Sequence, residues 1–170
     1  ATEGFLGAAC EHGVLHLNED SIAFEFERIG TSNRFRPIVT DLRRTTQPMV
    51  RVRLDDLVEL LEASCACGSP LRAIHPVEGR VADIWRWDEA MIFPREIDAA
   101  VSTALPPMAD WRAIASPTEV TLACNDKRAL QAQSALTALL VNSNVTLPVT
   151  PAPLTPPPGP KRRRVQWSNA

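Results

Sequence analysis

The sequence predicts an α+β fold: a mostly antiparallel sheet or partly open barrel with a C-terminal amphipathic helix, followed by a disordered, proline-rich tail. Short runs of alternating apolar and polar residues in the first third of the chain are typical of half-buried strands. Residues 127–141 instead repeat their apolar positions with helical spacing, and seven of the fifteen prolines lie between Pro148 and Pro160. A chain of 170 residues is long enough for one domain of ordinary size. We therefore expect a compact domain over 1–142 and a disordered tail over 143–170.

The first strands are predicted at 13–17 and 21–29, joined by a turn at 18–20 that contains Asn and Asp. Two strands joined in this way predict a hairpin, and alternation gives the second strand one apolar face, formed by Ile22, Phe24 and Phe26. Residues 35–40 and 49–54 repeat the pattern. In the latter, arginines alternate with apolar residues, so the arginines should face away from the apolar side.

The spacing of apolar residues changes to a helical one at 55–64, where Asp55 can cap the first turn. A second short helix is predicted at 96–105, because two prolines follow it directly. Further strands are predicted at 71–75, 80–87 and 119–124. The last helix, 127–141, should bury a stripe formed by Leu130, Ala135, Leu136, Leu139 and Leu140.

The stretch from Gly13 to Phe24 reads as strand, Asn-Glu-Asp turn and strand, and residues 120–124 lead into the closing helix. This order resembles the pleckstrin-homology superfold. The resemblance implies a partly open barrel capped by one helix, in a binder of phosphoinositides, peptides or histones. The helices predicted at 55–64 and 96–105 depart from that pattern and would have to be insertions or strands.

Charge is distributed unevenly, although the formal net charge is only −2. Residues 28–53 contain seven arginines and a single acid. Because arginine forms bidentate pairs with carboxylates and phosphates, this arginine band is a candidate site for an acidic protein or a phosphate ligand. The alternative is a solvated face paired with nearby acids, and nucleic acid is disfavoured because the rest of the domain is acidic. The candidate residues are Arg34, Arg36, Arg43, Arg44, Arg51 and Arg53.

The tail carries four consecutive cations, Lys161, Arg162, Arg163 and Arg164. In an extended, exposed segment these cations resemble a monopartite nuclear localisation signal. The resemblance implies importin alpha as a partner, through acidic and tryptophan-lined pockets, and a location in the nucleus as well as the cytoplasm. The alternative is a solvated basic end that contacts nucleic acid loosely.

An overlapping motif, formed by Arg164, Val165 and Trp167, resembles the Arg-Val-x-Phe/Trp docking motif of protein phosphatase 1 regulators. In that mode Val165 and Trp167 enter two apolar pockets from the same side of an added edge strand. The resemblance implies protein phosphatase 1 as a further partner.

Cysteine and histidine spacing predicts no metal site. Cys65 and Cys67, together with His75, supply three ligands, whereas a structural zinc site needs four. His12 and His16 lie four residues apart, but in a predicted loop and strand, where they do not form a helical metal pair. We therefore expect thiols in loops or in the core.

No catalytic residues and no cofactor are predicted, because no glycine-rich phosphate loop or nucleophile elbow is visible. Carboxylates do lie beside aromatic residues at Asp83, Trp85, Trp87, Asp88 and Glu89, an arrangement that would suit an enzyme doing general acid–base work on a sugar or a base. Alternation places the two tryptophans on one strand face, as in core or rim packing.

These observations predict a nuclear, non-catalytic adaptor protein without a membrane span, which binds a protein partner through its domain and the import machinery through its tail. The alternative is a viral or structural assembly protein whose domain self-associates and whose basic tail contacts nucleic acid.

Overall fold

The computed structural model describes residues 4–88, 90–155 and 163–168, which form two α-helices and several β-sheets. The predicted α+β class is confirmed. The chain divides into two compact units, Ala1–Val81 and Ala82–Ala170, which we call unit 1 and unit 2. This division departs from the boundary expected near residue 142. In the described part of the chain, no helix combines the length and the apolar character that crossing a membrane requires.

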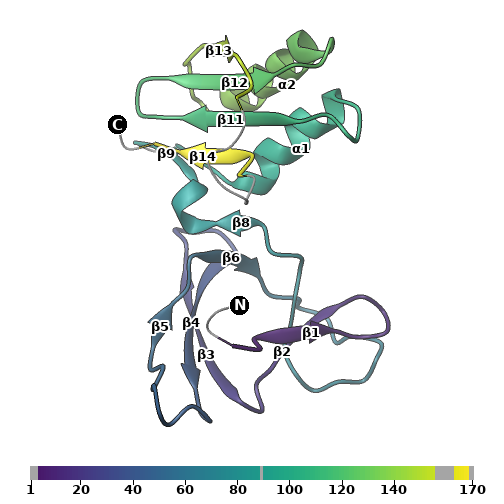
Figure 1. Cartoon of the computed structure of the whole chain (residues 1–170), viewed down its shortest axis with the longest axis vertical. Helices are drawn as coiled ribbons and strands as arrows, with labels where there is room; N and C mark the ends of the chain where they lie inside the picture. The colour runs from purple at the N-terminus through teal and green to yellow at the C-terminus, as the bar shows by residue number, and fades with distance from the viewer. Residues whose placement is uncertain (1–3, 89, 156–162, 169–170) are drawn as a thin grey trace. The chain divides into compact units, whose positions relative to one another are not determined.

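Unit 1 contains two antiparallel sheets, drawn from purple to teal in Figure 1. The larger sheet has the order β3-β4-β6-β8, with β5 also paired to β4. Its strands are β3 (Ile22–Arg28), β4 (Arg34–Asp41), β5 (Val52–Arg53), β6 (Asp56–Glu59) and β8 (Gly79–Arg80). The smaller sheet has the order β1-β2-β7, formed by β1 (Gly7–Ala9), β2 (Leu15–Leu17) and β7 (Ala73–Ile74). Both orders are open, so neither sheet closes into a barrel within the described residues.

The hairpin expected between 13–17 and 21–29 does not form. Its turn is present, because the carbonyl of Asn18 accepts hydrogen bonds from the amides of Ser21 and Ile22 at 3.3 and 3.0 Å. However, β2 pairs with β1 and β7, whereas β3 pairs with β4 over its whole length. The turn therefore passes the chain from one sheet to the other.

The helix predicted at 55–64 is wrong, because residues 56–59 form the strand β6. Leu57 and Val58 are adjacent in the strand and point to opposite faces, yet both are buried, at 0% and 3% exposure. A strand covered on both faces has consecutive apolar residues, and such a run cannot be distinguished from one side of a helix by periodicity.

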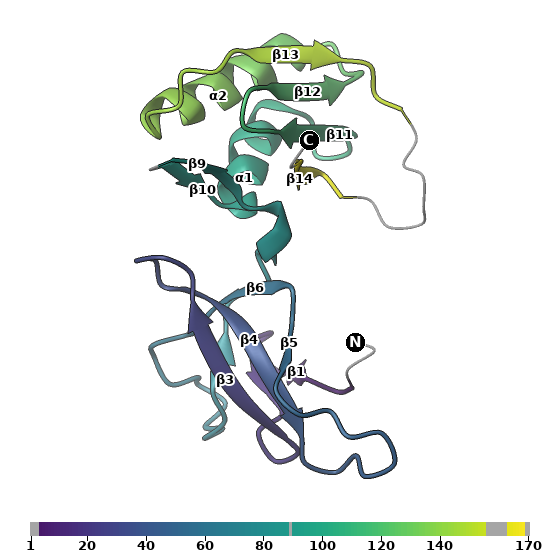
Figure 2. The same ribbon diagram turned by 90° about the vertical axis from the view of Figure 1, so that its left-hand side faces the viewer.

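Unit 2 contains a mixed four-stranded sheet with the order β13-β12-β11-β14. Figure 2 shows β13 and β14 at its two edges and both helices on one face. The sheet strands are β11 (Trp111–Ala115), β12 (Val120–Cys124), β13 (Val149–Ala152) and β14 (Val165–Trp167), and the helices are α1 (Pro94–Ala104) and α2 (Ala129–Asn142). A short hairpin, formed by β9 (Trp85–Trp87) and β10 (Ala90–Ile92), precedes α1, and a 3-10 turn, η1 (Val81–Asp83), precedes the hairpin.

Both helices lie close to their predicted positions. The start of α1 is defined by Pro94 in its first turn and by the Glu96 carboxylate, which accepts a hydrogen bond from the amide of Phe93 at 3.0 Å. The stripe that α2 buries is Ala132, Leu136 and Leu140. Leu130, expected in this stripe, is instead 76% exposed. These buried residues form one apolar cluster with alternate residues of β11 and β12.

The tail expected to be disordered over 143–170 contributes both edge strands of this sheet. Strand β13 pairs in parallel with β12, and β14 pairs in parallel with β11. Val165 is buried within the apolar cluster of unit 2, and Trp167 packs against that cluster. A proline-rich segment can supply an edge strand because such a strand needs hydrogen bonds on one side only.

Candidate functional site

Two tight turns of unit 1 each present cysteine thiols. In the first, the amide of Gly13 donates to the carbonyl of Cys10 at 2.9 Å, and in the second, the amide of Gly68 donates to the carbonyl of Cys65 at 3.1 Å. Both glycines have a positive φ, of 73° and 75°, which other residues adopt only with strain. The second turn also carries Cys67. Sulfur atoms from these two turns lie together, with the Sγ atoms of Cys10 and Cys65 3.7 Å apart.

His16 completes this group from strand β2. Its flanking residues, Leu15 and Leu17, pack into an apolar cluster on one face of the strand, so the imidazole points to the other face. There it is buried, at 7% exposure, and its Nε2 lies 3.4 Å from the Sγ of Cys67. Ligand atoms of all four residues, Cys10, His16, Cys65 and Cys67, lie within 4.8 Å of one another. We call this group the Cys3His cluster.

The ring nitrogen Nδ1 of His16 lies 3.1 Å from the backbone carbonyl of Leu71. A carbonyl oxygen only accepts hydrogen bonds, so Nδ1 carries the proton and donates it. In a neutral ring this leaves the lone pair on Nε2, the atom that faces the thiols.

The thiols of the Cys3His cluster influence each other's ionisation. Burial opposes ionisation of Cys10, but hydrogen bonds from the backbone at His12 and Val14 and from neighbouring side chains lower its pKa to about 7. For Cys65, a backbone hydrogen bond from Cys67 lowers the pKa, yet burial and the Cys67 and Cys10 side chains outweigh it and raise the pKa. The arrangement therefore favours one thiolate and disfavours a second beside it.

This cluster differs from the ligand set considered from the sequence, in which His75 accompanied the two adjacent cysteines. The group that lies together contains His16 and Cys10 in place of His75. One signal in the sequence could have indicated it: Cys10-x-x-Gly13 and Cys65-x-Cys67-Gly68 both place a glycine three residues after a cysteine. In both segments, the amide of that glycine donates a hydrogen bond to the carbonyl of the cysteine and closes a tight turn.

The pair of Glu19 and Arg72 holds the segment that orients His16. The Glu19 carboxylate accepts hydrogen bonds from the backbone amide and from the Nε of Arg72, each at 2.7 Å. Burial raises the pKa of Glu19, but the bonds and charge of Arg72 outweigh it and hold the pKa below its ordinary value of 4.5. Arg72 adjoins Leu71, whose carbonyl accepts from His16.

Glu19→Gln is expected to lower the free energy of unfolding by about 1 kcal/mol at pH 7, because one charge-assisted contact is lost. A lowered pKa stabilises the fold above the ordinary pKa, and that contribution disappears as the pH falls through the lowered value. Urea unfolding followed by circular dichroism at pH 7 and in acid checks this. The matched control is Glu62→Gln, at an exposed position; an equal loss in both variants would contradict the expectation.

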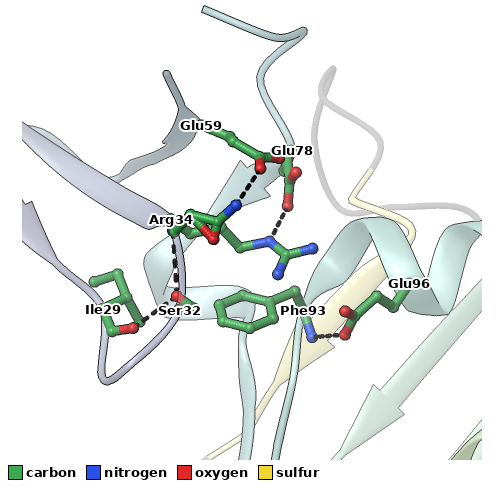
Figure 3. A network of polar contacts seen from close by, with 8 residues as sticks. Ile29, Ser32, Arg34, Glu59, Glu78, Phe93 and Glu96 are labelled. Atoms are coloured by element: carbon green, nitrogen blue, oxygen red, sulfur yellow. Dashed lines mark hydrogen bonds and ion pairs between the residues drawn. The ribbon is translucent and has the colours of Figure 1, made fainter. Parts of the chain in front are cut away.

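The arginine band is extensively paired with carboxylates. Figure 3 shows Arg34 and Glu78 pointing toward one another, and the Arg34 Nε donates to the Glu78 carboxylate at 2.6 Å. The Glu78 side chain is only 1% exposed, so this pair is largely shielded from solvent. The other ion pairs are more exposed and join Arg36 to Glu27 and Asp55, Arg44 to Asp41, Arg51 to Glu25, and Arg53 to Glu27. Among the described residues, no ion pair is observed for the exposed Arg43. Anion binding here stays a prediction, and a ligand would have to replace carboxylate partners.

The described basic residues of the tail form ion pairs within unit 2. Arg163 pairs with Asp83, and Arg164 lies 3.5 Å from Asp98. Trp167 packs edge-to-face on Trp87, with the ring centroids 5.2 Å apart. Two residues of the predicted localisation signal, Lys161 and Arg162, lie outside the described residues.

Docking of Val165 and Trp167 to protein phosphatase 1 would require β14 to leave the sheet. Binding of importin alpha or of the phosphatase, and nuclear localisation, are not tested by the structure and stay predictions.

The tryptophan and carboxylate stretch is part of the unit 2 core. Trp85 is fully buried and its indole donates to the carbonyl of Gln166 at 2.8 Å. The indole of Trp87 donates to the carbonyl of Ser116 at 3.0 Å. Both tryptophans therefore have structural contacts, as the alternation predicted. An open depression of about 590 Å³ lies beside Trp87 and Asp88, and Glu89 lies outside the described residues.

No family model and no curated protein sequence matches this chain, whereas several solved structures have a similar fold. Its fold is similar to that of 2-hydroxyisobutyryl-CoA ligase in the postadenylation state with 2-HIB-AMP, with a TM-score of 0.67 and 21% identity over 96% of this chain and 39% of the ligase chain. An open conformation of that ligase with 2-HIB-AMP and CoA gives a TM-score of 0.55 and 21% identity over 92% and 38% of the two chains.

A third similar structure is GH3.15 acyl acid amido synthetase, with a TM-score of 0.53 and 14% identity over 79% of this chain and 29% of the synthetase. At these identities the likeness shows the fold. The chain spans about two fifths of the length of the ligase chains that it resembles.

This likeness corrects the function expected from the sequence. The prediction of a non-catalytic adaptor is wrong, and the alternative of a self-assembling structural protein is not retained, because the fold is one that ligases contain. The same likeness contradicts the prediction that the protein is not an enzyme. Sequence reasoning missed this because it assigned the last 28 residues to a tail, although two of the four strands of the unit 2 sheet lie there.

Proposed function

We propose that this chain forms part of an acyl-activating ligase, an enzyme that converts a carboxylic acid into an acyl adenylate and passes the acyl group to an acceptor. The observation that carries the proposal is the likeness of nearly the whole chain, 96% of it, to part of a CoA ligase with an acyl adenylate bound. The acyl acid amido synthetase supports it from a second type of ligase.

The chemistry has two balanced steps. A carboxylate oxygen attacks the α-phosphorus of ATP, which forms the acyl adenylate and releases pyrophosphate. The acceptor then attacks the acyl carbon, so that the bond to AMP breaks and AMP leaves. Both steps develop negative charge on oxygen atoms, which fixed cations and hydrogen-bond donors stabilise.

Within this proposal, the arginine band of unit 1 is the surface for the phosphate groups of an adenylate or of CoA. Arginine suits such groups because its planar guanidinium donates two parallel hydrogen bonds. Most of the band is already paired with carboxylates, so we assign the first contact to the exposed Arg43. Its neighbour Arg44 is less suited because it pairs with Asp41 at 3.5 Å.

Ligand binding to the full chain tests the proposal without requiring turnover. In nitrogen-15 NMR spectra, saturable shifts are expected on adding a non-hydrolysable acyl-adenylate mimic or CoA. Arg43→Ala should weaken binding about fivefold, as expected for one exposed charge-assisted contact. The control is Arg95→Ala, an equal charge change at an exposed position of unit 2.

Two outcomes are separable. If neither ligand gives a saturable shift up to about 5 mM, the binding free energy is weaker than about −3 kcal/mol, and this result would contradict the ligase proposal. If the ligand binds and Arg43→Ala leaves its affinity unchanged, the ligase proposal stands, but the assignment of the phosphate contact to the arginine band is wrong.

A further inference from the structure

We propose that Cys10, His16, Cys65 and Cys67 bind one Zn²⁺ ion in a closed structural site that joins distant segments of unit 1. The proposal rests on the Cys3His cluster alone and does not depend on the function proposed above. Four nitrogen and sulfur ligands, of the types that zinc prefers, lie within 4.8 Å of one another.

Two of the distances within the cluster match the edges of a zinc tetrahedron, and all four ligand atoms lie within 4.8 Å of one another. Zinc–sulfur bonds of about 2.3 Å at the tetrahedral angle place two sulfur atoms about 3.8 Å apart, and a sulfur and a nitrogen about 3.6 Å apart. The Sγ atoms of Cys10 and Cys65 are separated by 3.7 Å, and the Sγ of Cys67 and the Nε2 of His16 by 3.4 Å. One ion could therefore bridge these two pairs, and ligand atoms still separated by up to 4.8 Å would move closer together by at most about 1 Å.

The histidine is already oriented as a zinc ligand. Ligating histidines donate their second ring N–H to a carbonyl or carboxylate, which fixes the tautomer and the direction of the lone pair. His16 makes this contact through Nδ1 to the carbonyl of Leu71, while Nε2 faces Cys67. A histidine that only filled space in the core would not need its free nitrogen directed at three thiols.

The geometry does not favour a disulfide. The 3.7 Å between the sulfur atoms of Cys10 and Cys65 is far longer than a covalent bond of about 2.05 Å, and all four cysteines of the chain are free. A disulfide would also leave Cys67 and His16 without a function in the cluster. Three thiolates held this closely repel one another, and a divalent cation removes that repulsion.

The site is structural because four protein ligands leave no position for a substrate or water. Its ligands come from two turns and strand β2, and cysteines 55 residues apart in the chain are brought together. Unit 1 has a small core: two of its apolar clusters contain three buried residues each, Leu17, Val58 and Ile74 in one and Ile22, Val39 and Leu54 in the other. Small domains with such cores are commonly stabilised by a metal.

Metal content of the full chain, purified without a polyhistidine tag and under reducing conditions, is the first measurement. One Zn²⁺ per chain is expected by mass spectrometry of the elements, and Cys67→Ser or His16→Ala should reduce this to less than about one fifth. The matched controls are Cys124→Ser and His12→Ala, the same residue types outside the cluster, and both should retain the full zinc content.

Cobalt replacement on the wild-type chain keeps the test valid if the variants do not fold. Titrating the metal-free protein with Co²⁺ should give the visible absorption of a tetrahedral thiolate site, with a break at one equivalent, and Zn²⁺ should remove that absorption. Removing zinc with a chelator should also lower the melting temperature of unit 1 by more than about 10 °C, followed by circular dichroism.

Three results would overturn the proposal. The first is a zinc content that Cys67→Ser and His16→Ala leave unchanged. The second is a wild-type chain that shows neither bound zinc nor a cobalt spectrum after refolding with the metal. The third is a disulfide between Cys10 and Cys65 that persists in the chain purified under reducing conditions.

Discussion

Replacing Val165 with aspartate is expected to lower the free energy of unfolding of unit 2 by about 4 kcal/mol. Val165 is 7% exposed within the apolar cluster of this unit, so the variant places an ionised carboxylate where little water can solvate it. It also lies opposite Ala113 in the parallel pairing of β14 with β11. The substitution therefore weakens both the packing and the attachment of this edge strand.

Tryptophan fluorescence during urea unfolding measures this effect specifically, because all four tryptophans, at 85, 87, 111 and 167, lie in unit 2. The matched control is Val141→Asp, at a position that is 60% exposed, where the expected loss is about 0.5 kcal/mol. If both variants lost less than about 0.5 kcal/mol, β14 would be a mobile tail after all.

Arg34→Leu is expected to lower the free energy of unfolding of unit 1 by about 3 kcal/mol. The substitution removes the guanidinium that lies 2.6 Å from the Glu78 carboxylate, and that carboxylate is 1% exposed. Removing one partner of a buried ion pair is strongly destabilising because the remaining charge loses that partner without regaining water.

Arg53→Leu provides the control, because the same change is made in an ion pair whose two side chains are 58% and 38% exposed. There the expected loss is at most about 1 kcal/mol. Unit 1 contains no tryptophan, so its stability is followed by hydrogen exchange of peptides from strand β4, measured by mass spectrometry. Equal exchange in the two variants would show that the Arg34 pair contributes no more than a surface contact.

Local periodicity predicted the elements whose burial lies on one face. Strands β3, β4 and β12 and both helices appear close to where alternation or helical spacing placed them. The method was wrong at β6, because a strand buried on both faces has no alternation to detect. It also missed β11, although burial alternates along that strand, and β13 and β14, which follow the prolines of the last segment.

The candidate metal site was only partly visible in the sequence. The spacing of Cys65 and Cys67 indicates two neighbouring ligands, whereas the sequence places His16 in a predicted strand and gives it no metal partner. Its burial depends on the pairing of β2 with β7, which places His16 opposite Ala73. Nothing in the residues around His16 predicts that pairing.

The sequence by itself determined the α+β class, the two helices and the arginine band. Only the tertiary structure decided that Val165 pairs with Ala113, and that Cys10 and His16 meet thiols 55 and 51 residues away. The reason is that periodicity reflects residues a few positions apart. Which distant segments pair depends on the free energy of the whole arrangement, in which loop closure, burial and hydrogen bonding are balanced together.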